Sequence, residues 1–337
     1  MGDPTASSEK TPEKRRLEAL SSYQFVLTFL FMGLSCSLLI LWLLFTSLWL
    51  LSVLYLAWLF LDWDTPHQAG RRSQWVRNWP IWRHLRDYYP IKLVKTAELP
   101  PDRNYVLAAH PHGIMCTGVA CNFCTESNGF SQHFPGLRPY LATLASLFHL
   151  PVYRDYLLAL GMCPVSRQSL EAILAQAQQG QAVVILVGGA HESLYARPGE
   201  HCLKLRGRKG FVRLALRNGA SLVPVYSFGE NDVFRLKAFP EGSWQHRCQT
   251  AFKNFLGFAP CLFWGQSIFS NRAWGLLPFA SPITTVVGSP ISVPQRANPS
   301  QEEVDHYHRL YMEALERLFE EHKQDCGVPE ATHLTFI

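Results

Sequence analysis

The sequence predicts an α/β protein that an N-terminal helical hairpin attaches to a membrane. Three observations support this prediction. Residues 19–61 carry no charged side chain over 43 positions. Beyond them, short apolar runs typical of buried strands alternate with segments of helical periodicity. Two of these runs end in histidines or glycines, at the carboxyl ends of strands, where α/β proteins place their binding and catalytic groups.

Residues 19–61 form the predicted membrane anchor. One crossing takes about 20 residues, so this segment exceeds one crossing and approaches two. Basic residues flank it on both sides, at Lys14–Arg16 and at Arg71-Arg72. Because basic flanks favour the cytosolic side, we expect a hairpin with both ends in the cytosol and a turn at Gly33-Leu34-Ser35 or at Thr46-Ser47. A re-entrant loop and a single tilted span are the alternatives.

The anchor divides the chain into three parts. Residues 1–18 are mostly polar and charged, and we expect a disordered N-terminal tail there. No second apolar stretch of membrane-spanning length follows Leu61, so residues 62–337 are predicted to form one globular domain. The formal net charge of +5 is mild, and no nucleic-acid partner is expected. Nine cysteines with one close pair, Cys121 and Cys124, favour reduced thiols over a zinc site.

Residues 62–337 are predicted to build a mostly parallel or mixed sheet, because strand-like and helix-like segments alternate. Strands are expected at Tyr105–Ala109, Ala182–Val187, Ser221–Phe228 and Ile283–Val287. Helices are expected at Arg167–Gln179, at Lys209–Arg217 and after the capping box Ser300-Gln301-Glu302-Glu303.

The motif His110-Pro111-His112-Gly113 follows the first expected strand. Proline restricts the backbone, while Gly113 allows a close approach to a substrate. Histidine accepts a proton near neutral pH, so the motif suggests a general base for a hydroxyl nucleophile. The alternatives are a structural turn with surface histidines and a His-x-His metal pair. Further zinc ligands are scarce, with Cys116, His191 and Glu192 the nearest in motif terms, and no metal is expected.

A second candidate, Gly188-Gly189-Ala190-His191-Glu192-Ser193, follows the strand expected at Ala182–Val187. Adjacent glycines leave backbone N–H groups accessible, so Gly188 and Gly189, together with Gly113, are candidate oxyanion-binding positions. Glu192 is the candidate partner of the histidine motif, as a carboxylate that orients an imidazole or accepts a proton. The alternative is a carboxylate at a helix start that faces solvent. His191 is expected in a supporting or surface position.

A basic run supplies a third candidate. Lys209, Arg213 and Arg217 recur every four residues and share one face of the expected helix, directly after Arg208. Such a stripe could hold the phosphates of a nucleotide-bearing donor. A solvated charged face is the equally weighted alternative.

Four motifs then combine: Arg86-Asp87-Tyr88-Tyr89-Pro90, His110-Pro111-His112-Gly113, Asn122-Phe123-x-Thr125-Glu126, and the segment from Arg208-Lys209-Gly210-Phe211 to Phe228-Gly229-Glu230-Asn231. Together they resemble the type-two diacylglycerol acyltransferase family, most of all its monoacylglycerol acyltransferase branch, from about Tyr23 to Ile337. The family commonly has Phe where this chain has Tyr89. Its Phe-Leu-rich lipid-binding signature is approximated by Phe29-Leu30-Phe31-Met32.

The resemblance implies an acyltransferase domain that faces the cytosol at the endoplasmic reticulum membrane, with lipid droplets as a further location. It implies acyl-CoA as co-substrate, no separate cofactor, and monoacylglycerol or diacylglycerol as acceptor. A wax-alcohol acceptor and a non-catalytic lipid-binding protein are the alternatives, and a homo-oligomer is left open. A lipase would be expected to carry Gly-x-Ser-x-Gly, which the sequence lacks.

For acyl transfer we expect a mechanism without a covalent intermediate. His112 removes the proton of a glycerol hydroxyl, and the oxygen attacks the CoA thioester. Glu192 orients and balances the imidazolium. His110 shapes the turn or shares the role of base. The basic stripe, Arg208 included, holds the phosphates of CoA.

Overall fold

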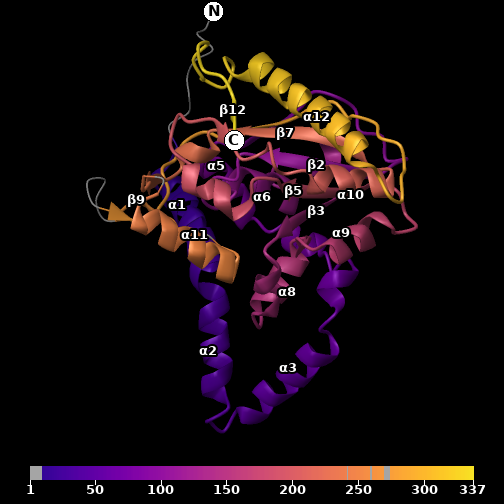
Figure 1. The fold of residues 1–337 in the computed structure, drawn as a ribbon. Helices are drawn as coiled ribbons and strands as arrows, with labels where there is room; N and C mark the ends of the chain where they lie inside the picture. Colours follow the sequence, from indigo (N-terminus) through magenta and orange to yellow (C-terminus); the bar gives the residue numbers. More distant parts are fainter. Residues whose placement is uncertain (1–9, 241, 259, 269–273) are drawn as a thin grey trace, which may run out of the picture.

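The computed structural model describes residues 10–240, 242–258, 260–268 and 274–337 (Figure 1). A central sheet has helices on both of its faces, and a helical hairpin extends away from this globular part (Figure 1). The predicted α/β class with an N-terminal hairpin is therefore confirmed.

The central sheet has seven strands in the order β1-β11-β7-β2-β5-β3-β4. Their bounds are β1 Lys92–Lys95, β2 Tyr105–His110, β3 Arg138–Thr143, β4 Met162–Pro164, β5 Gln181–Leu186, β7 Ser221–Phe228 and β11 Thr284–Val287. The five strands from β7 to β4 run parallel to one another, whereas β11 is antiparallel to β7 and parallel to β1. The predicted mixed sheet is confirmed, and the carboxyl ends of β2, β5 and β7 meet at one edge.

Two small sheets complete the strand inventory of the described ranges. β6 (Cys202–Leu203) pairs with β12 (Thr335–Phe336) in parallel. β8 (Arg235–Lys237), β9 (Leu262–Gln266) and β10 (Trp274–Gly275) form an antiparallel sheet. The extreme C-terminus is thus tied to the segment that follows the Gly188–Ser193 motif.

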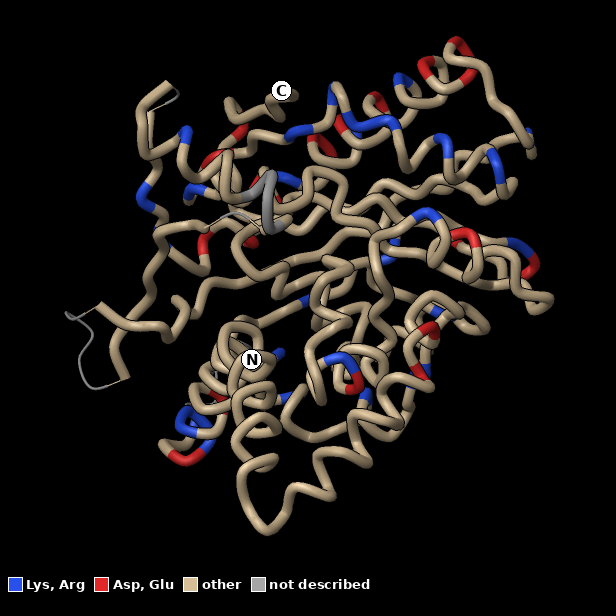
Figure 2. Tube along the Cα trace, turned by 60° about the horizontal axis from the view of Figure 1, so that its bottom comes forward, with Lys and Arg blue, Asp and Glu red and all other residues tan. Residues whose placement is uncertain are grey.

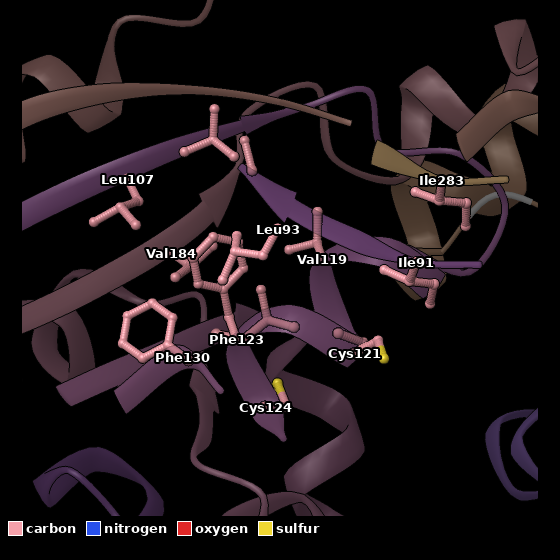
Figure 3. Close-up of a cluster of buried hydrophobic side chains, with 14 of the residues drawn as sticks. Ile91, Leu93, Leu107, Val119, Cys121, Phe123, Cys124, Phe130, Val184 and Ile283 are labelled. Atoms are coloured by element: carbon pink, nitrogen blue, oxygen red, sulfur yellow. The ribbon is translucent and has the colours of Figure 1, made fainter. Parts of the chain in front are cut away.

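The main strands are continuous apolar runs because both faces of the sheet are covered. Every residue of β2 and β7 is buried. On one face, Leu107 and Val184 lie in a cluster with Phe123 and Phe130 (Figure 3). On the other face, Val106 and Val183 belong to a second cluster that includes side chains of α10 (Gly210–Asn218) and α12 (Gln301–His322).

Helices of the globular part are α4 Gln74–Arg77, α5 Ile81–Tyr88, α6 Thr117–Cys124, α7 Phe130–His133, α8 Tyr153–Ala159, α9 Arg167–Leu174, α10 Gly210–Asn218, α11 Trp244–Leu256 and α12 Gln301–His322. Short 3₁₀ helices lie at η2 Thr65–Gln68, η3 Ala145–His149, η4 Gly189–Tyr195 and η5 Glu230–Asp232. The capping box is confirmed, because Ser300 Oγ accepts from Glu303 N at 3.1 Å and Glu303 Oε2 accepts from Ser300 N at 2.9 Å. The helix predicted to reach Gln179 ends at Leu174, the last of its core-facing apolar residues.

The hairpin consists of a long helix and a shorter return leg (Figure 1). α1 (Pro12–Leu27), a π-helical turn η1 (Thr28–Met32) and α2 (Gly33–Leu43) run on as one helix. It is the one described helix long and apolar enough to cross a membrane, and its most apolar window is 11% buried. α3 (Trp49–Leu61) returns after a reversal at residues 44–48. Of the two expected turn positions, Thr46-Ser47 is confirmed, whereas Gly33 lies within the helix.

The prediction of a disordered tail over residues 1–18 is wrong for residues 12–18, which are helical. α1 begins at Pro12, where Thr11 Oγ1 accepts from Lys14 N at 3.3 Å as the helix cap. Residues 1–9 lie outside the described ranges. The helix docks on the globular part through a hydrogen bond of 2.7 Å between the buried hydroxyls of Ser22 and Tyr89. Tyr89, which stands where phenylalanine was expected from the resemblance, therefore anchors α1 through its hydroxyl.

Candidate active site

The two glycine-containing motifs meet at the carboxyl edge of the sheet. His110 is the last residue of β2, and Gly188 follows its parallel neighbour β5. The Glu192 carboxylate bridges the motifs, since its Oε1 accepts a hydrogen bond of 2.7 Å from the backbone N–H of His112. The spatial contact between these candidates, which the spacing alone did not settle, is present in the structure.

His110 is fully buried and lies against α12. The Tyr311 hydroxyl donates to Ala108 O at 2.8 Å, so it accepts from His110 Nε2 at 3.1 Å. Nδ1 is buried without a hydrogen-bond partner among the described residues. Burial lowers the pKa of His110 to about 3, so the ring is neutral at physiological pH. This environment fits a residue that fixes the strand end to α12, and it does not favour a shared role as base.

His112 is partly buried, and its ring has contacts that define its tautomer. Nδ1 lies 3.1 Å from Gly113 O, which can only accept, so Nδ1 carries the hydrogen. Ser193 Oγ lies 3.0 Å from the same nitrogen. Burial lowers the pKa of His112, and Nε2 is left with an unprotonated lone pair. Cys116 Sγ lies 3.8 Å from that nitrogen.

Glu192 does not contact the imidazole, contrary to the role expected for it. Its two oxygens accept from backbone N–H groups, of His112 at 2.7 Å and of Lys204 at 2.9 Å. The side chain is buried, so the solvent-facing alternative is also wrong. Burial raises the pKa of Glu192 to about 7 against the two hydrogen bonds and the nearby charge of Arg208. The carboxylate therefore holds the loop by its backbone, and Ser193 is the residue of the Gly188–Ser193 motif whose side chain contacts the ring.

A second buried carboxylate, Glu230, was not a candidate from the sequence. It accepts from Thr117 N at 2.6 Å and Gly118 N at 2.8 Å, at the start of α6. Burial raises its pKa to about 7. A Cβ at Gly113 would lie 2.7 Å from Glu230 Cγ, so the glycine makes room for this carboxylate. The signal in the sequence was its position just after the apolar run Ser221–Phe228, and the structure adds that this strand, β7, lies parallel to β2.

The three glycines proposed for the oxyanion have different surroundings. A side chain at Gly188 would overlap the Glu192 carboxylate, and one at Gly113 would meet Glu230. Gly189 has a φ of +59° and borders open space, since an added Cβ would meet nothing within 4 Å. Of the three, Gly189 is thus the position where a ligand can approach the backbone most closely.

The basic stripe is largely neutralised by its neighbours. Lys209 Nζ lies 2.7 Å from Asp305 Oδ1 on α12, and Arg217 Nη1 lies 3.8 Å from Glu171 Oε1 on α9. Arg213 donates to the Gln301 side chain. Arg208 differs, because its charge lowers the pKa of Glu192. Of the four basic residues, Arg208 is the one whose charge acts on the Glu192 carboxyl group.

The other sequence candidates have structural partners. Lys204 Nζ lies 3.1 Å from His191 Nδ1, and the His191 ring stacks on Tyr195. Within the described ranges, no group of three or more His, Cys, Asp or Glu side chains is placed to hold a metal ion. Burial raises the pKa of the Cys116 thiol, which therefore stays protonated.

The site thus presents one partly buried imidazole with an unprotonated Nε2, between two buried carboxylates that fix its loop. An imidazole of lowered pKa can take a proton from a hydroxyl in the transition state. Glu192 holds the backbone N–H of His112, and Glu230 holds the start of α6, which follows the histidine loop. The arrangement is suited to general-base chemistry at the carboxyl edge of the sheet.

Comparison with known proteins relates this site to lipid acylation. The diacylglycerol acyltransferase family matches residues 41–337. Human 2-acylglycerol O-acyltransferase 3 is 73% identical over 334 residues, which cover 99% of this chain and 97% of that protein. Human diacylglycerol O-acyltransferase 2 is 52% identical over 317 residues, covering 94% and 82%. Among solved structures, the 1-acyl-sn-glycerophosphate acyltransferase of Thermotoga maritima is similar with a TM-score of 0.41 and 12% identity, over 92% of this chain and 96% of that chain.

Proposed function

This chain belongs to the diacylglycerol acyltransferase family, and from that membership we propose that it esterifies a 2-acylglycerol with the acyl chain of acyl-CoA. The product is diacylglycerol. The relative that shares 73% identity is named for the 2-acylglycerol reaction. The relative at 52% is named for diacylglycerol, which we propose as a second acceptor. The structural observation that supports this function best is the imidazole of His112, held at the sheet edge with an unprotonated Nε2.

In the proposed step, His112 Nε2 removes the proton of the glycerol hydroxyl while the oxygen attacks the thioester carbonyl carbon. The tetrahedral intermediate then collapses, the C–S bond breaks, and the imidazolium returns its proton to the CoA sulfur. Backbone N–H groups at Gly189 or Gly113 are proposed to stabilise the oxyanion. Loss of one such donor typically costs about 3 kcal/mol of the barrier. No covalent acyl-enzyme and no metal enters this step.

The donor is proposed to enter from the side of Arg208. CoA carries several phosphate charges, and a guanidinium binds phosphate through charge-assisted hydrogen bonds. Lys209 and Arg217 form ion pairs with Asp305 and Glu171, so less of their positive charge is available to a ligand. Arg208 is therefore the member of the basic stripe that we assign to the CoA phosphates.

The protein is proposed to act at the endoplasmic reticulum membrane with its globular part in the cytosol, and to associate with lipid droplets. Many large apolar side chains of the hairpin are exposed, including Leu34, Trp42, Leu54 and Phe60. Figure 2 shows that charged residues lie on the globular part and the flanks of the hairpin, while its far end carries none. Lipid that surrounds this end would deliver apolar acceptors to the domain.

The acceptor is tested by incubating the purified protein with labelled oleoyl-CoA and a panel of acceptors. We expect labelled diacylglycerol from 2-acylglycerol as the main product, and triacylglycerol from diacylglycerol at a lower rate. Labelled ester from a long-chain fatty alcohol alone would replace the proposal with a wax-alcohol activity. Absence of any labelled ester, in a preparation that still binds oleoyl-CoA, would indicate a non-catalytic lipid-binding protein.

A further inference from the structure

A cavity of about 630 Å³ lies away from the histidine loop, at the opposite end of the parallel strands. It is bordered by Arg138 at the start of β3 and by Gln176 and Gln178 in the loop that leads into β5. Those positions mark the amino ends of strands, whereas His110 marks the carboxyl end of β2. The volume is within the roughly 300–1,000 Å³ typical of small-molecule sites. This cavity is therefore separate from the proposed active site.

The lining of this cavity is polar and basic. As far as the described residues show, it includes three arginines and no Asp or Glu; the arginines are Arg71, Arg72 and Arg138. The side chains of Gln68, Gln74 and Tyr140 add uncharged hydrogen-bonding groups. A lining of this composition selects for an anionic ligand with polar substituents.

Arg72 is largely buried, whereas Arg71 and Arg138 are exposed. Its side chain is 10% exposed, and its Nε and Nη1 atoms have no hydrogen-bond partner among the described residues. Its Nη2 atom lies 3.7 Å from Glu126 Oε1, which is shared with Arg77 at 3.0 Å. Burial, with the charge of Arg77 in second place, lowers the pKa of Arg72 to about 10, so the guanidinium stays charged at pH 7. A buried charge with incomplete pairing is costly unless a ligand compensates it.

The local charges do not balance. Arg72, Arg77 and Arg138 contribute three positive charges, and Glu126 contributes one negative charge, which leaves +2. The Arg138 backbone N–H donates to Gly180 O at 2.8 Å, but its side chain makes no hydrogen bond or ion pair within the described ranges. Arg71 is neutralised separately, because it pairs with Asp62 at 2.7 Å and with Asp155 at 3.1 Å. A phosphomonoester, with a charge of about −1.5 to −2 at neutral pH, would compensate the excess.

We propose that this cavity is a phosphate-binding site in which Arg72 and Arg138 hold a phosphomonoester. Two sources share this chemistry, a soluble nucleotide and the head group of an anionic lipid. The hairpin reaches the rim of the cavity, because the Arg71 guanidinium lies 5.1 Å from the ring centre of Trp58 in α3. The site lies at the junction between the hairpin and the globular part, where ligand binding would bear on both.

The test uses the full-length protein in nanodiscs or detergent, with two probes. Adenosine 3′,5′-bisphosphate is the soluble probe, and vesicles of phosphatidylcholine with phosphatidic acid are the lipid probe. We expect at least one probe to bind, and Arg138→Gln to weaken that binding by about tenfold or more. Arg138 is exposed, so this variant should fold normally. Arg72→Gln should have a larger effect, with thermal unfolding as the check of its fold.

Two controls make the outcome decisive. Arg317→Gln removes an equal charge from an exposed position on α12 and should leave binding of either probe unchanged. Arg208→Gln alters the proposed donor site at the other end of the sheet. If nucleotide binding is lost in Arg208→Gln and retained in Arg138→Gln, the nucleotide binds at the catalytic edge. The proposal would be overturned if the nucleotide binds at the catalytic edge and lipid binding does not depend on Arg138. It would also be overturned if neither probe binds.

Discussion

The side chain of Glu192 lies in the predicted place but makes contacts that were not predicted. Its presence after a buried strand identified it as a candidate, and the structure places it against His112 as expected. The spacing did not reveal that the carboxylate accepts two backbone N–H groups rather than facing the imidazole. The side chain of the Gly188–Ser193 motif that contacts the ring is Ser193, which was not a candidate from the sequence. Side-chain direction in an irregular loop depends on its neighbours in space, and periodicity carries no such information.

The raised pKa of Glu192 predicts a measurable dependence of stability on pH. Its pKa rises from an ordinary value of about 4.5 to about 7 in the folded state, so the stability it contributes is present below pH 4.5. That stability is lost as the pH rises through 7, by up to about 3 kcal/mol. Glu192→Gln should remove this loss. We expect the difference in unfolding free energy between wild type and variant to shrink from pH 4.5 to 8, as measured by denaturant unfolding.

The comparison of wild type and variant is necessary because other groups titrate in the opposite direction. Burial lowers the pKa of His110 to about 3, and its contribution to stability is therefore lost as the pH falls from 6.5 to 3. If wild type and Glu192→Gln differ in unfolding free energy by the same amount at every pH from 4.5 to 8, the pKa of the Glu192 carboxyl group does not change on folding.

At the scale of elements, apolar pattern was a reliable guide to strands and a weaker one to helix ends. Ser221–Phe228 was predicted with its observed bounds, because a strand buried on both faces is a continuous apolar run. The helix from Arg167 was predicted too long, since the alternating Ala and Gln after Leu174 has good helix propensity and no core contact to extend it. The pattern placed four basic residues around α10 without revealing that α9 and α12 supply their partners.

Those partners change what we expect of the basic residues. Arg208→Gln should raise the KM for acyl-CoA severalfold and make that KM less sensitive to salt, with little effect on the KM for the acylglycerol. The double variant Arg213→Gln and Arg217→Gln removes more charge and serves as the comparison, because these side chains contact α12 and α9. Steady-state kinetics at two ionic strengths distinguishes phosphate binding by Arg208 from phosphate binding by Arg213 and Arg217. A larger change in the KM for acyl-CoA in the double variant than in Arg208→Gln would show that the basic stripe, and not Arg208, binds the CoA phosphates.

For the whole molecule, the sequence predicted the division into a hairpin and an α/β domain, and it did not predict the strand order. β1 pairs with β11 across residues 92–95 and 284–287, and no local pattern specifies such a distant partner. The same holds for the active site, because part of it depends on the strand order. Glu230 lies in the site only because β7 is next to β2, so the sequence alone did not identify it. The docking of α1 through Ser22 and Tyr89 is likewise a contact between distant segments.

The hairpin predicts that both chain ends are on the same side of the membrane. Basic residues flank both legs, and α3 returns towards the globular part (Figure 1). Tags placed at the N-terminus and after Ile337 should both be cleaved by protease added to intact microsomes. A lumenal marker protein that stays intact is the control for sealed vesicles. Protection of the N-terminal tag alone would establish a single crossing instead.

The central claim is that His112 acts as the general base, and the substitution His112→Asn tests it most directly. Asparagine keeps polarity and similar size but accepts no proton at neutral pH, so kcat for 2-acylglycerol acylation should fall by about 100-fold or more. The melting temperature and membrane attachment should stay as in wild type. His191→Asn is the matched control, a histidine next to Glu192 whose ring contacts Lys204 and Tyr195. Near-normal turnover in a correctly folded His112→Asn protein would contradict the account.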